Sequence, residues 1–130
     1  YVKTKSRLQK AIKIMGQHLL PGGVLLVEPW FAPDEWHPGR VYVTQVDKGD
    51  SKIVRMSHSS QRGKVSIIEF QYLFGTPKGI KRDTEILELG LFTKQEYLDA
   101  FRSAGLNVIH DLKGLDGRGL YIGLKPLDVK

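Results

Sequence analysis

HLLPGGVLLVE, residues 18–28, is the stretch that decides the fold. It connects a helix, expected over residues 4–19 because apolar side chains recur there at helical spacing, to a short apolar strand. The Pro-Gly-Gly run at residues 21–23 ends the helix and opens a turn. The strand at residues 24–28 is apolar throughout, which is typical of a strand buried on both faces inside a parallel sheet. We therefore expect an α/β fold with this strand in the interior.

After this strand the apolar pattern changes to a two-residue spacing. Residues 29–39 are rich in Pro and Trp, and we expect a loop whose aromatic side chains pack against a ligand or another part of the molecule. Alternating segments separated by short polar turns then predict an antiparallel meander. The expected strands of this meander are residues 41–46, 52–60, 65–74 and 80–92.

The last part of the chain returns to helix and strand. Thr93 and Glu96 form a capping box that opens a helix, and Gly105 is expected directly after its end. Residues 106–112 and 120–124 predict two further strands around a glycine-rich turn. We expect an antiparallel strand at the edge of an otherwise parallel sheet.

Length and composition limit the class of protein. The 130 residues fit one domain, with helix and strand of the wound sheet in 1–28, loop and β insertion in 29–92, and a terminal helix and strand pair in 93–130. The absence of Cys excludes disulfides and thiolate metal sites, and no His, Asp or Glu residues have metal-ligand spacing. No run is long and apolar enough to span a membrane. The first residues read like the middle of a chain, so we expect a truncated N-terminus.

The net charge of +6 raises the question of nucleic-acid binding. The cations are spread along the chain and are densest on the polar side of the first expected helix, which favours a solvated surface over a phosphate-binding one. A non-enzymatic basic β module that binds nucleic acid stays an alternative. Strongly salt-dependent binding of random oligonucleotides would identify it.

Two parts of the chain resemble class I S-adenosylmethionine-dependent methyltransferases. Residues 18–28 are similar to the junction between a helix and the fifth sheet strand of that superfamily. Its last helix and sixth strand are matched by Leu91-Phe92-Thr93, Glu96-Tyr97, Ala100-Phe101, Ala104-Gly105-Leu106 and Val108. The resemblance implies the C-terminal half of a Rossmann-like methyltransferase sheet with an inserted antiparallel β meander.

A narrower resemblance runs over essentially the whole chain. It is to N,N-dimethyltransferases of nucleotide-linked amino-deoxysugars, of the kind found in desosamine and mycaminose pathways. Four runs carry it: Glu28-Pro29-Trp30-Phe31, Arg55-Met56-Ser57-His58-Ser59, Gly90-Leu91-Phe92-Thr93 and Gly117-Arg118-Gly119-Leu120-Tyr121. It implies N-methylation of a small amine such as a nucleotide-linked amino sugar. A methyltransferase that acts on another small molecule or on a protein is the alternative.

The resemblance also implies that the cofactor is S-adenosylmethionine and that it is held mainly outside this chain. The acidic-Gly-x-Gly-x-Gly loop near the start of such enzymes does not occur in the sequence, and the glycine-rich residues 114–119 lie at the wrong end and precede a strand. We therefore expect no cofactor-binding residue here and a missing N-terminal half as the partner of this chain. The 130 residues alone are expected to be inactive.

The candidate site residues lie in the same runs. Arg118, on a tight turn with small neighbours, is expected to clamp a substrate pyrophosphate, and a surface arginine is the alternative. Trp30 and Phe31 follow the strand end at which ligands bind in open α/β sheets, where they contact substrate or anchor the loop. Glu28, at that strand end, is expected to accept hydrogen bonds from an amino or hydroxyl group, or to serve a helix N-terminus.

The other candidate site residues lie in two separate parts of the sequence, residues 55–59 and the first residue. Arg55, His58 and Ser59 are expected to contact a nucleotide or diphosphate, and a polar outer sheet face is the alternative. In a regular strand Arg55 and Ser59 face one side and His58 the other, so the three cannot line one site without a bulge. By resemblance Tyr1 lies near the transferring methyl group as the catalytic residue, where a phenol can accept the departing proton.

We also expect a cytoplasmic homodimer. Half of a wound sheet exposes a strand edge and an apolar face, and such a surface favours pairing. The remaining partner is a small-molecule substrate, with a sugar nucleotide as the leading candidate. Neither a membrane nor nucleic acid is the expected partner.

Overall fold

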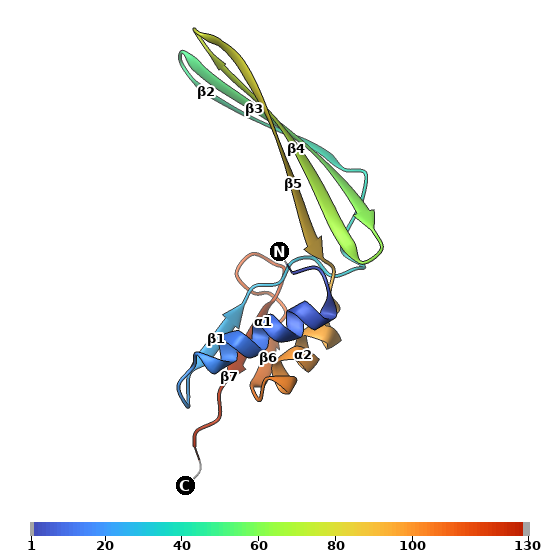
Figure 1. Cartoon of the computed structure of the whole chain (residues 1–130), viewed down its shortest axis with the longest axis vertical. Coiled ribbons are helices and arrows are strands. Elements are labelled where there is room, and N and C mark those ends of the chain that lie inside the picture. Colours follow the sequence, from blue (N-terminus) through green and yellow to red (C-terminus); the bar gives the residue numbers. More distant parts are fainter. Residues whose placement is uncertain (1, 129–130) are drawn as a thin grey trace. The chain divides into compact units, whose positions relative to one another are not determined.

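The computed structural model describes residues 2–128 and divides into two compact units (Figure 1). The first unit comprises Tyr1–Glu35 and Gly90–Lys130, and the second is Trp36–Leu89. The elements follow the expected order of helix, strand, loop, four long strands, helix and two strands. The fold class predicted from the sequence, an α/β chain with an antiparallel β insertion, is confirmed.

The first unit is a small sheet covered by two helices. Its strands are β1 (Val24–Val27), β7 (Leu120–Leu124) and β6 (Asn107–Asp111), in that spatial order, and β7 is antiparallel to both neighbours. The helices α1 (Lys5–Gln17) and α2 (Lys94–Ser103) pack against each other and against one face of the sheet. Because β7 is antiparallel to both, β1 and β6 run in the same direction and end at the same edge of the sheet.

Residues 24–28, predicted as an interior strand of a wound sheet, are not buried on both faces within this chain and form the exposed edge expected of half such a sheet. Among the residues that the structure describes, β1 is an edge strand that pairs with β7 alone. Leu25 and Val27 pack against the core, whereas Val24 and Leu26 are 50% and 60% exposed. The alternation arises because the helices cover one face of β1 and no described element covers the other.

The antiparallel strand also has a different place from the predicted one. We expected it at the edge, but β7 lies in the middle, with Leu124 opposite Val24 on one side and opposite Asn107 on the other. β7 carries two of the buried residues of the sheet, Tyr121 and Gly123. A Cβ atom at Gly123 would lie 2.6 Å from the Phe101 ring, so α2 packs directly on the backbone of this strand. Such close burial favours the central position.

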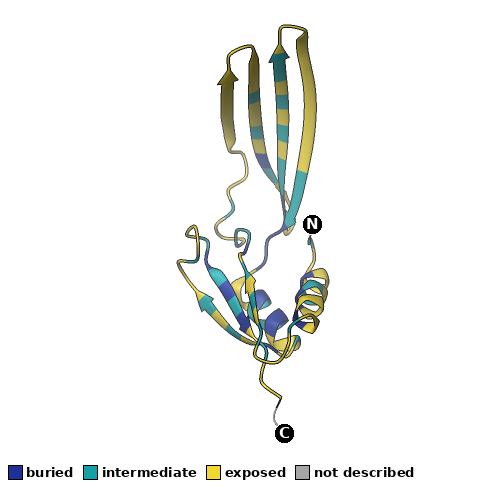
Figure 2. Ribbon diagram, turned by 90° about the vertical axis from the view of Figure 1, so that its left-hand side faces the viewer, coloured by how far each residue is buried: buried dark blue, intermediate teal, exposed yellow. Residues whose placement is uncertain are grey.

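The core of the first unit lies between the helices and β7 (Figure 2). Phe101 is fully buried and Ile12 is 1% exposed, and Gly16 allows α1 to approach the Leu106 side chain. Burying a large apolar side chain stabilises a fold by about 1.5–3 kcal/mol. The buried cluster is Leu8, Ile12, Phe92, Tyr97, Ala100, Phe101, Leu106 and Tyr121.

The ends of α2 confirm the predicted capping residues. The hydroxyl of Thr93 accepts a hydrogen bond from the backbone N–H of Glu96 at 3.1 Å, as an N-cap side chain does. At the other end Gly105 has φ +77°, and its N–H donates to the carbonyl of Arg102. The N–H of Leu106 donates to the carbonyl of Phe101, which completes a Schellman motif.

The second unit is the predicted antiparallel meander. It consists of β2 (Val41–Lys48), β3 (Ser51–Arg62), β4 (Val65–Thr76) and β5 (Gly79–Gly90), and each strand lies beside the next in the sheet. The register between β3 and β4 runs without interruption from Lys52↔Gly75 to Arg62↔Val65. No helix belongs to this unit, so both faces keep exposed apolar side chains.

A short loop is fastened to β3 within this unit. The hydroxyl of Ser59 donates to the carbonyl of His37 at 3.0 Å and accepts from the N–H of Arg40 at 3.0 Å. The backbone of Ser59 also bonds to Gly39 and Arg40, and the indole N–H of Trp36 donates to the carbonyl of Ser60. These bonds account for the burial of Ser59, which is 8% exposed.

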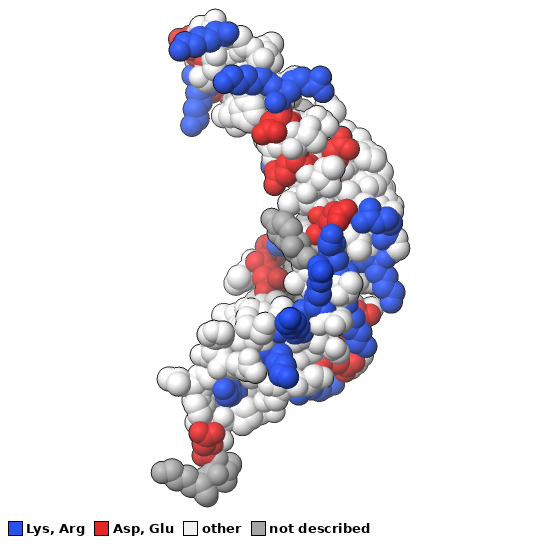
Figure 3. Space-filling model, in the orientation of Figure 1, with Lys and Arg blue, Asp and Glu red and all other residues white. Residues whose placement is uncertain are grey.

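Charged side chains are distributed over the surface of both units. Blue cationic and red anionic atoms are interspersed in the view of Figure 3, among many uncharged residues. The four cations of α1, Lys5, Arg7, Lys10 and Lys13, are exposed to solvent. Neither described helix has the length and apolar character needed to cross a membrane.

Candidate functional site

A pocket of about 110 Å³ lies at the edge of the sheet where β1 and β6 end. In open α/β sheets ligands bind outside the carboxyl ends of the strands. The walls come from the loop after β1, the first turn of α2, the end of β6 and the start of β7. The lining residues are Pro29, Trp30, Ala32, Glu35, Phe92, Lys94, Tyr97, His110, Leu112, Gly117, Arg118 and Tyr121.

Arg118 stands at the centre of a charged and aromatic cluster in this wall. Its Nη2 atom lies 3.1 Å from Oε1 of Glu28 and 2.8 Å from Oδ2 of Asp116. Its guanidinium carbon lies 5.6 Å from the ring centre of Trp30 and 5.7 Å from that of Phe31, within cation–π range. Two carboxylates thus share one guanidinium, and the three groups together carry one net negative charge.

The structure therefore brings together four of the site residues predicted from the sequence. Glu28 and Arg118 are 90 positions apart in the chain, and their contact depends on the pairing of β1 with β7. The side chain of Arg118 is 28% exposed and that of Glu28 is 36% exposed. Trp30 and Phe31 meet edge to face at 4.9 Å between ring centres.

A stack of aromatic rings forms the floor of the pocket. The rings of Tyr97 and Tyr121 are stacked with centres 4.5 Å apart, and the His110 imidazole lies 4.5 Å from Tyr121. Burial raises the pKa of Tyr121 to about 12, and the neighbouring Tyr97 and Glu35 add to the shift. Burial likewise raises the pKa of Tyr97, although a hydrogen bond with the backbone of Trp30 opposes this. Both phenols are consequently neutral at physiological pH.

His110 is held in the wall by close backbone packing. A Cβ atom at Gly119 would lie 2.7 Å from Nε2 of His110, so only glycine fits there. Burial lowers the pKa of His110, and the cation of Lys94 lowers it further, whereas Asp111 and Glu35 act in the opposite direction. The imidazole is therefore neutral at physiological pH.

Two polar atoms of the wall are buried without a hydrogen-bond partner. They are Nδ1 of His110 and Nε of Arg118. Buried polar atoms in folded proteins are paired in the great majority of cases. The pocket thus combines apolar ring edges with a few unsatisfied polar atoms, which is the usual make-up of a ligand site.

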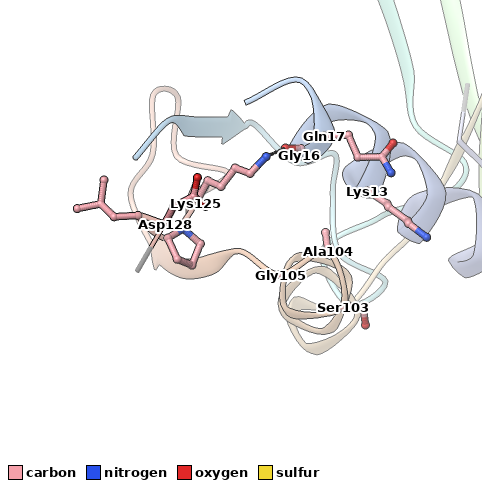
Figure 4. A pocket seen from close by; sticks show the side chains of 10 residues that line it. Lys13, Gly16, Gln17, Ser103, Ala104, Gly105, Lys125 and Asp128 are labelled. Atoms are coloured by element: carbon pink, nitrogen blue, oxygen red, sulfur yellow. Dashed lines mark hydrogen bonds between the residues drawn. The ribbon is translucent and has the colours of Figure 1, made fainter. Parts of the chain in front are cut away.

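A second cavity, of about 340 Å³, lies at the opposite end of the sheet strands and has a structural explanation (Figure 4). There the ammonium of Lys125 donates to the carbonyls of Gly16 at 3.3 Å and Leu19 at 2.7 Å. These carbonyls lie at the C-terminal end of α1, where a cation balances the helix dipole. Lys125 therefore has a structural role at this end of the sheet.

The other predicted site residues lie elsewhere. Arg55, His58 and Ser59 belong to β3 in the second unit, and the continuous register places His58 on the face opposite to the other two. The guanidinium of Arg55 lies 5.0 Å from the ring centre of Phe70. Tyr1, the predicted catalytic residue, lies outside the described residues.

Sequence reasoning missed several residues of the pocket. His110, Tyr97 and Tyr121 look like ordinary core or surface positions when the chain is read as a sequence. The register of β6 with β7 places His110 directly opposite Tyr121, and that register is not encoded in any local pattern. Asp116, two residues before Arg118 on the same glycine-rich turn, was the one available signal.

The glycine-rich segment of the described residues is closed by backbone contacts. This turn, residues 114–119, is closed by a bridge between Gly114 and Gly119. Even a Cβ atom at Gly114 would lie 2.3 Å from the carbonyl oxygen of Gly119, so no ligand group fits between the two arms. Within residues 2–128 there is also no group of three or more His, Cys, Asp or Glu side chains that could hold a metal ion.

Known proteins are similar to this chain in sequence and fold, although no family model matches it. The chain is 40% identical over 121 residues to a dTDP-3-amino-3,6-dideoxy-alpha-D-glucopyranose N,N-dimethyltransferase of Streptomyces fradiae. This match covers 92% of the chain and 48% of that protein. Over 125 residues the chain is 36% identical to a dTDP-4-amino-2,3,4,6-tetradeoxy-D-glucose N,N-dimethyltransferase of Saccharopolyspora spinosa, covering 96% of this chain and 50% of that protein.

A solved structure agrees with these relatives. An amino pentose methyltransferase from Micromonospora echinaspora, with S-adenosylmethionine bound, superposes with a TM-score of 0.86 at 33% identity. The match covers 95% of this chain and 52% of that structure, so the chain spans about half the length of the proteins it matches. In sequence and fold, the chain is therefore related to the S-adenosylmethionine-dependent sugar N-methyltransferases and corresponds to their C-terminal half.

Proposed function

We propose that this chain is the substrate-binding half of an N-methyltransferase whose acceptor is an amine on a nucleotide-linked deoxysugar. The Arg118 cluster carries the proposal, because it places charged and aromatic groups at the ligand-binding edge of the sheet. S-adenosylmethionine supplies the methyl group when it is bound by the intact protein. The meander, within the inserted residues 29–92, serves substrate recognition.

The roles in the first unit follow from the charges of the cluster. A diphosphate placed beside Arg118 would meet the carboxylates of Glu28 and Asp116, which repel it. We therefore assign Arg118 and Glu28 to the amino-sugar end of the acceptor. Trp30 and Phe31 provide flat apolar surface for the sugar ring, and orientation of the amine is the main contribution to the rate.

Methyl transfer to a defined acceptor tests this function. The intact protein, incubated with S-adenosylmethionine and dTDP-3-amino-3,6-dideoxyglucose, is expected to add first one and then a second methyl group, as read by mass spectrometry. Arg118→Gln should raise KM by about tenfold or more, as expected for the loss of a charged hydrogen bond. Arg102→Gln, an exposed arginine of α2, is the matched control and should leave KM unchanged.

The alternative acceptors make the test decisive. Methylation of phosphate-free amines in place of dTDP-linked amino sugars would show that the protein belongs to another acceptor class. Equal effects of Arg118→Gln and Arg102→Gln would remove Arg118 from the site. Failure to methylate any of these amines would contradict the proposed function.

We also propose roles for the candidates outside the pocket. Tyr1 is the proposed catalytic residue, and Tyr1→Phe in the intact protein should lower kcat while KM stays the same. Arg55, His58 and Ser59 are proposed substrate contacts of the second unit. Alanine at Arg55 or His58 should raise KM, and an unchanged KM in both variants would remove both residues from the substrate site.

A homodimer formed through the meander is part of the proposal. Val43 and Met56 are direct partners on one sheet face, and they are 55% and 50% exposed. The same face holds a groove of about 420 Å³ lined by Val54, Met56 and Leu73 among others. A second copy of the chain offers a matching apolar face, as self-complementary dimer interfaces require.

Mass measured by light scattering over a range of concentrations tests the dimer. The wild-type protein should have the mass of two chains, and Val43→Lys combined with Met56→Lys should reduce it to one. Thr44→Lys, on the opposite face of the same strand, is the control and should stay dimeric. A wild-type mass of one chain at all concentrations would contradict the proposal.

A cytoplasmic location also belongs to the proposal, in keeping with a substrate that carries a nucleoside diphosphate. Fractionation of the source cells tests it. The protein should be recovered with the soluble fraction after lysis, and recovery from the medium would contradict it.

A further inference from the structure

The pocket beside Arg118 contains two buried polar atoms that no group of the described chain satisfies. They are Nδ1 of His110 and Nε of Arg118, and both residues line the same cavity. They come from different elements, the end of β6 and the turn before β7. Two unpaired polar atoms on one small cavity indicate a ligand group that pairs with them.

The chemistry of the two atoms restricts that group. Arginine Nε carries a hydrogen and can only donate. His110 is neutral, so one ring nitrogen donates and the other accepts. The Nη2 atom of Arg118 is already paired with Glu28 and Asp116, which orients the guanidinium and leaves Nε as a buried donor without a partner. A hydroxyl group matches both atoms, since it accepts one hydrogen bond and donates another.

The size of the cavity also suits a sugar that carries such a hydroxyl group. Its volume of about 110 Å³ equals about four water molecules at ~30 Å³ each, which is enough for one side of a sugar ring. The apolar walls, formed by Pro29, Trp30 and Phe92, suit the carbon atoms of a deoxysugar.

We propose that His110 is a specificity-determining residue, whose Nδ1 accepts a hydrogen bond from a ring hydroxyl of the acceptor sugar while Nε of Arg118 donates to the same hydroxyl. The identity of the acceptor rests on the proposed function. Gly119 and Tyr121 hold the imidazole in place from two sides. The site therefore favours acceptors that retain a ring hydroxyl over those that have lost all of them.

Two acceptors that differ in their hydroxyl groups test the inference on the intact protein. The sugar of dTDP-3-amino-3,6-dideoxyglucose keeps ring hydroxyls, whereas that of dTDP-4-amino-2,3,4,6-tetradeoxyglucose has none. His110→Phe should raise KM for the first acceptor by about tenfold, the size of one lost hydrogen bond, and leave KM for the second unchanged. His110→Asn, whose amide lies near the position of Nδ1, should recover part of the loss.

A measurement on the unaltered side chain covers the case in which the variants fold poorly. Nitrogen NMR of the imidazoles should show the His110 signals shifting on addition of the dideoxy acceptor and not on addition of the tetradeoxy one. His18 is the internal reference, because its Nδ1 is bonded to the carbonyl of Ile14 on the exposed end of α1. His18→Phe is the matched control variant and should keep the wild-type KM for both acceptors.

The outcomes separate this inference from the proposed function. An equal rise in KM for both acceptors, or His110 signals that do not shift on addition of the dideoxy sugar, would overturn the role of His110. Neither result would contradict methyl transfer itself. A wild-type protein that methylates neither acceptor overturns the proposed function and this inference with it. A loss confined to the hydroxyl-bearing acceptor, with rescue by His110→Asn, supports both.

Discussion

Gly119 shows how a single residue shapes the pocket through the absence of a side chain. Its φ is +87°, a backbone conformation that residues with a Cβ atom rarely adopt. A Cβ atom there would also lie 2.7 Å from Nε2 of His110 and 3.3 Å from the carbonyl oxygen of Asp111. The position of His110 therefore depends on glycine at residue 119.

We predict that Gly119→Ala destabilises the fold by about 2–4 kcal/mol, because strain of the positive φ adds to the clash with His110. Gly117→Ala is the matched control. Its φ is +90°, but no atom lies within 4 Å of an added Cβ, so only the backbone strain of ~1 kcal/mol remains. Urea unfolding of both variants measures the difference, and equal losses would contradict the packing role of Gly119.

The raised pKa of Tyr121 predicts how the free energy of unfolding changes at alkaline pH. Its folded pKa of about 12 lies above the ordinary value of 10.0. Between these two pH values the unfolded chain ionises this phenol and the folded protein does not, so the free energy of unfolding falls as pH rises through that window. Below pH 10 the contribution is fully present. Urea unfolding at a series of pH values should show this fall.

The variant Tyr121→Phe should make the fall between pH 10 and about 12 less steep, since Phe has no proton to lose. Tyr42→Phe is the control, because Tyr42 is 58% exposed on β2. Its stability curve should follow that of the wild type. An unchanged slope in Tyr121→Phe would show that this phenol does not couple folding to pH.

At the scale of elements, α2 has both of its ends specified by local side chains. Thr93 caps its first turn, and Gly105 with Leu106 closes its last turn. The helix supplies Tyr97 to the pocket and Phe101 to the core, so its position affects both. A weakened cap should therefore be visible in stability as well as in substrate binding.

We predict that Thr93→Ala lowers the free energy of unfolding by about 1 kcal/mol, the usual effect of losing an N-cap hydroxyl. Thr93→Ser keeps the accepting oxygen 3.1 Å from the N–H of Glu96 and should be close to the wild type. Thermal unfolding followed by circular dichroism measures both. If Thr93→Ser were as unstable as Thr93→Ala, the methyl group and not the cap would be responsible.

At the scale of the whole molecule, the proposed function assigns the acceptor side of the reaction, and not cofactor binding, to this chain. Its one glycine-rich turn is closed on itself, within the described residues. We predict that the 130-residue chain binds S-adenosylhomocysteine with little or no measurable affinity in isothermal titration. The intact protein, measured in parallel, should bind it. Micromolar binding by the 130 residues alone would contradict this prediction.

The surface of the molecule bears on the nucleic-acid alternative at the same scale. The 20 basic residues exceed the 14 acidic ones, and anionic atoms lie among the cationic ones in the view of Figure 3. A dispersed charge gives weak, nonspecific attraction to phosphates.

The sequence by itself determined the elements of this protein. The helices, the four-stranded meander and both caps of α2 were predicted close to their observed ends, because each depends on periodicity or hydrogen bonds within a few residues. Resemblance in short runs added the relation to sugar N-methyltransferases, and the comparisons confirmed it.

Only the tertiary structure decided how these elements meet. The central place of β7, the one-sided burial of β1 and the pairing of His110 with Tyr121 all depend on strand register over long sequence separations. The contact between Glu28 and Arg118 bridges 90 positions for the same reason. Local sequence patterns indicate which face of a strand is apolar. They do not indicate which strand lies beside it, because many strand pairings bury a similar apolar area.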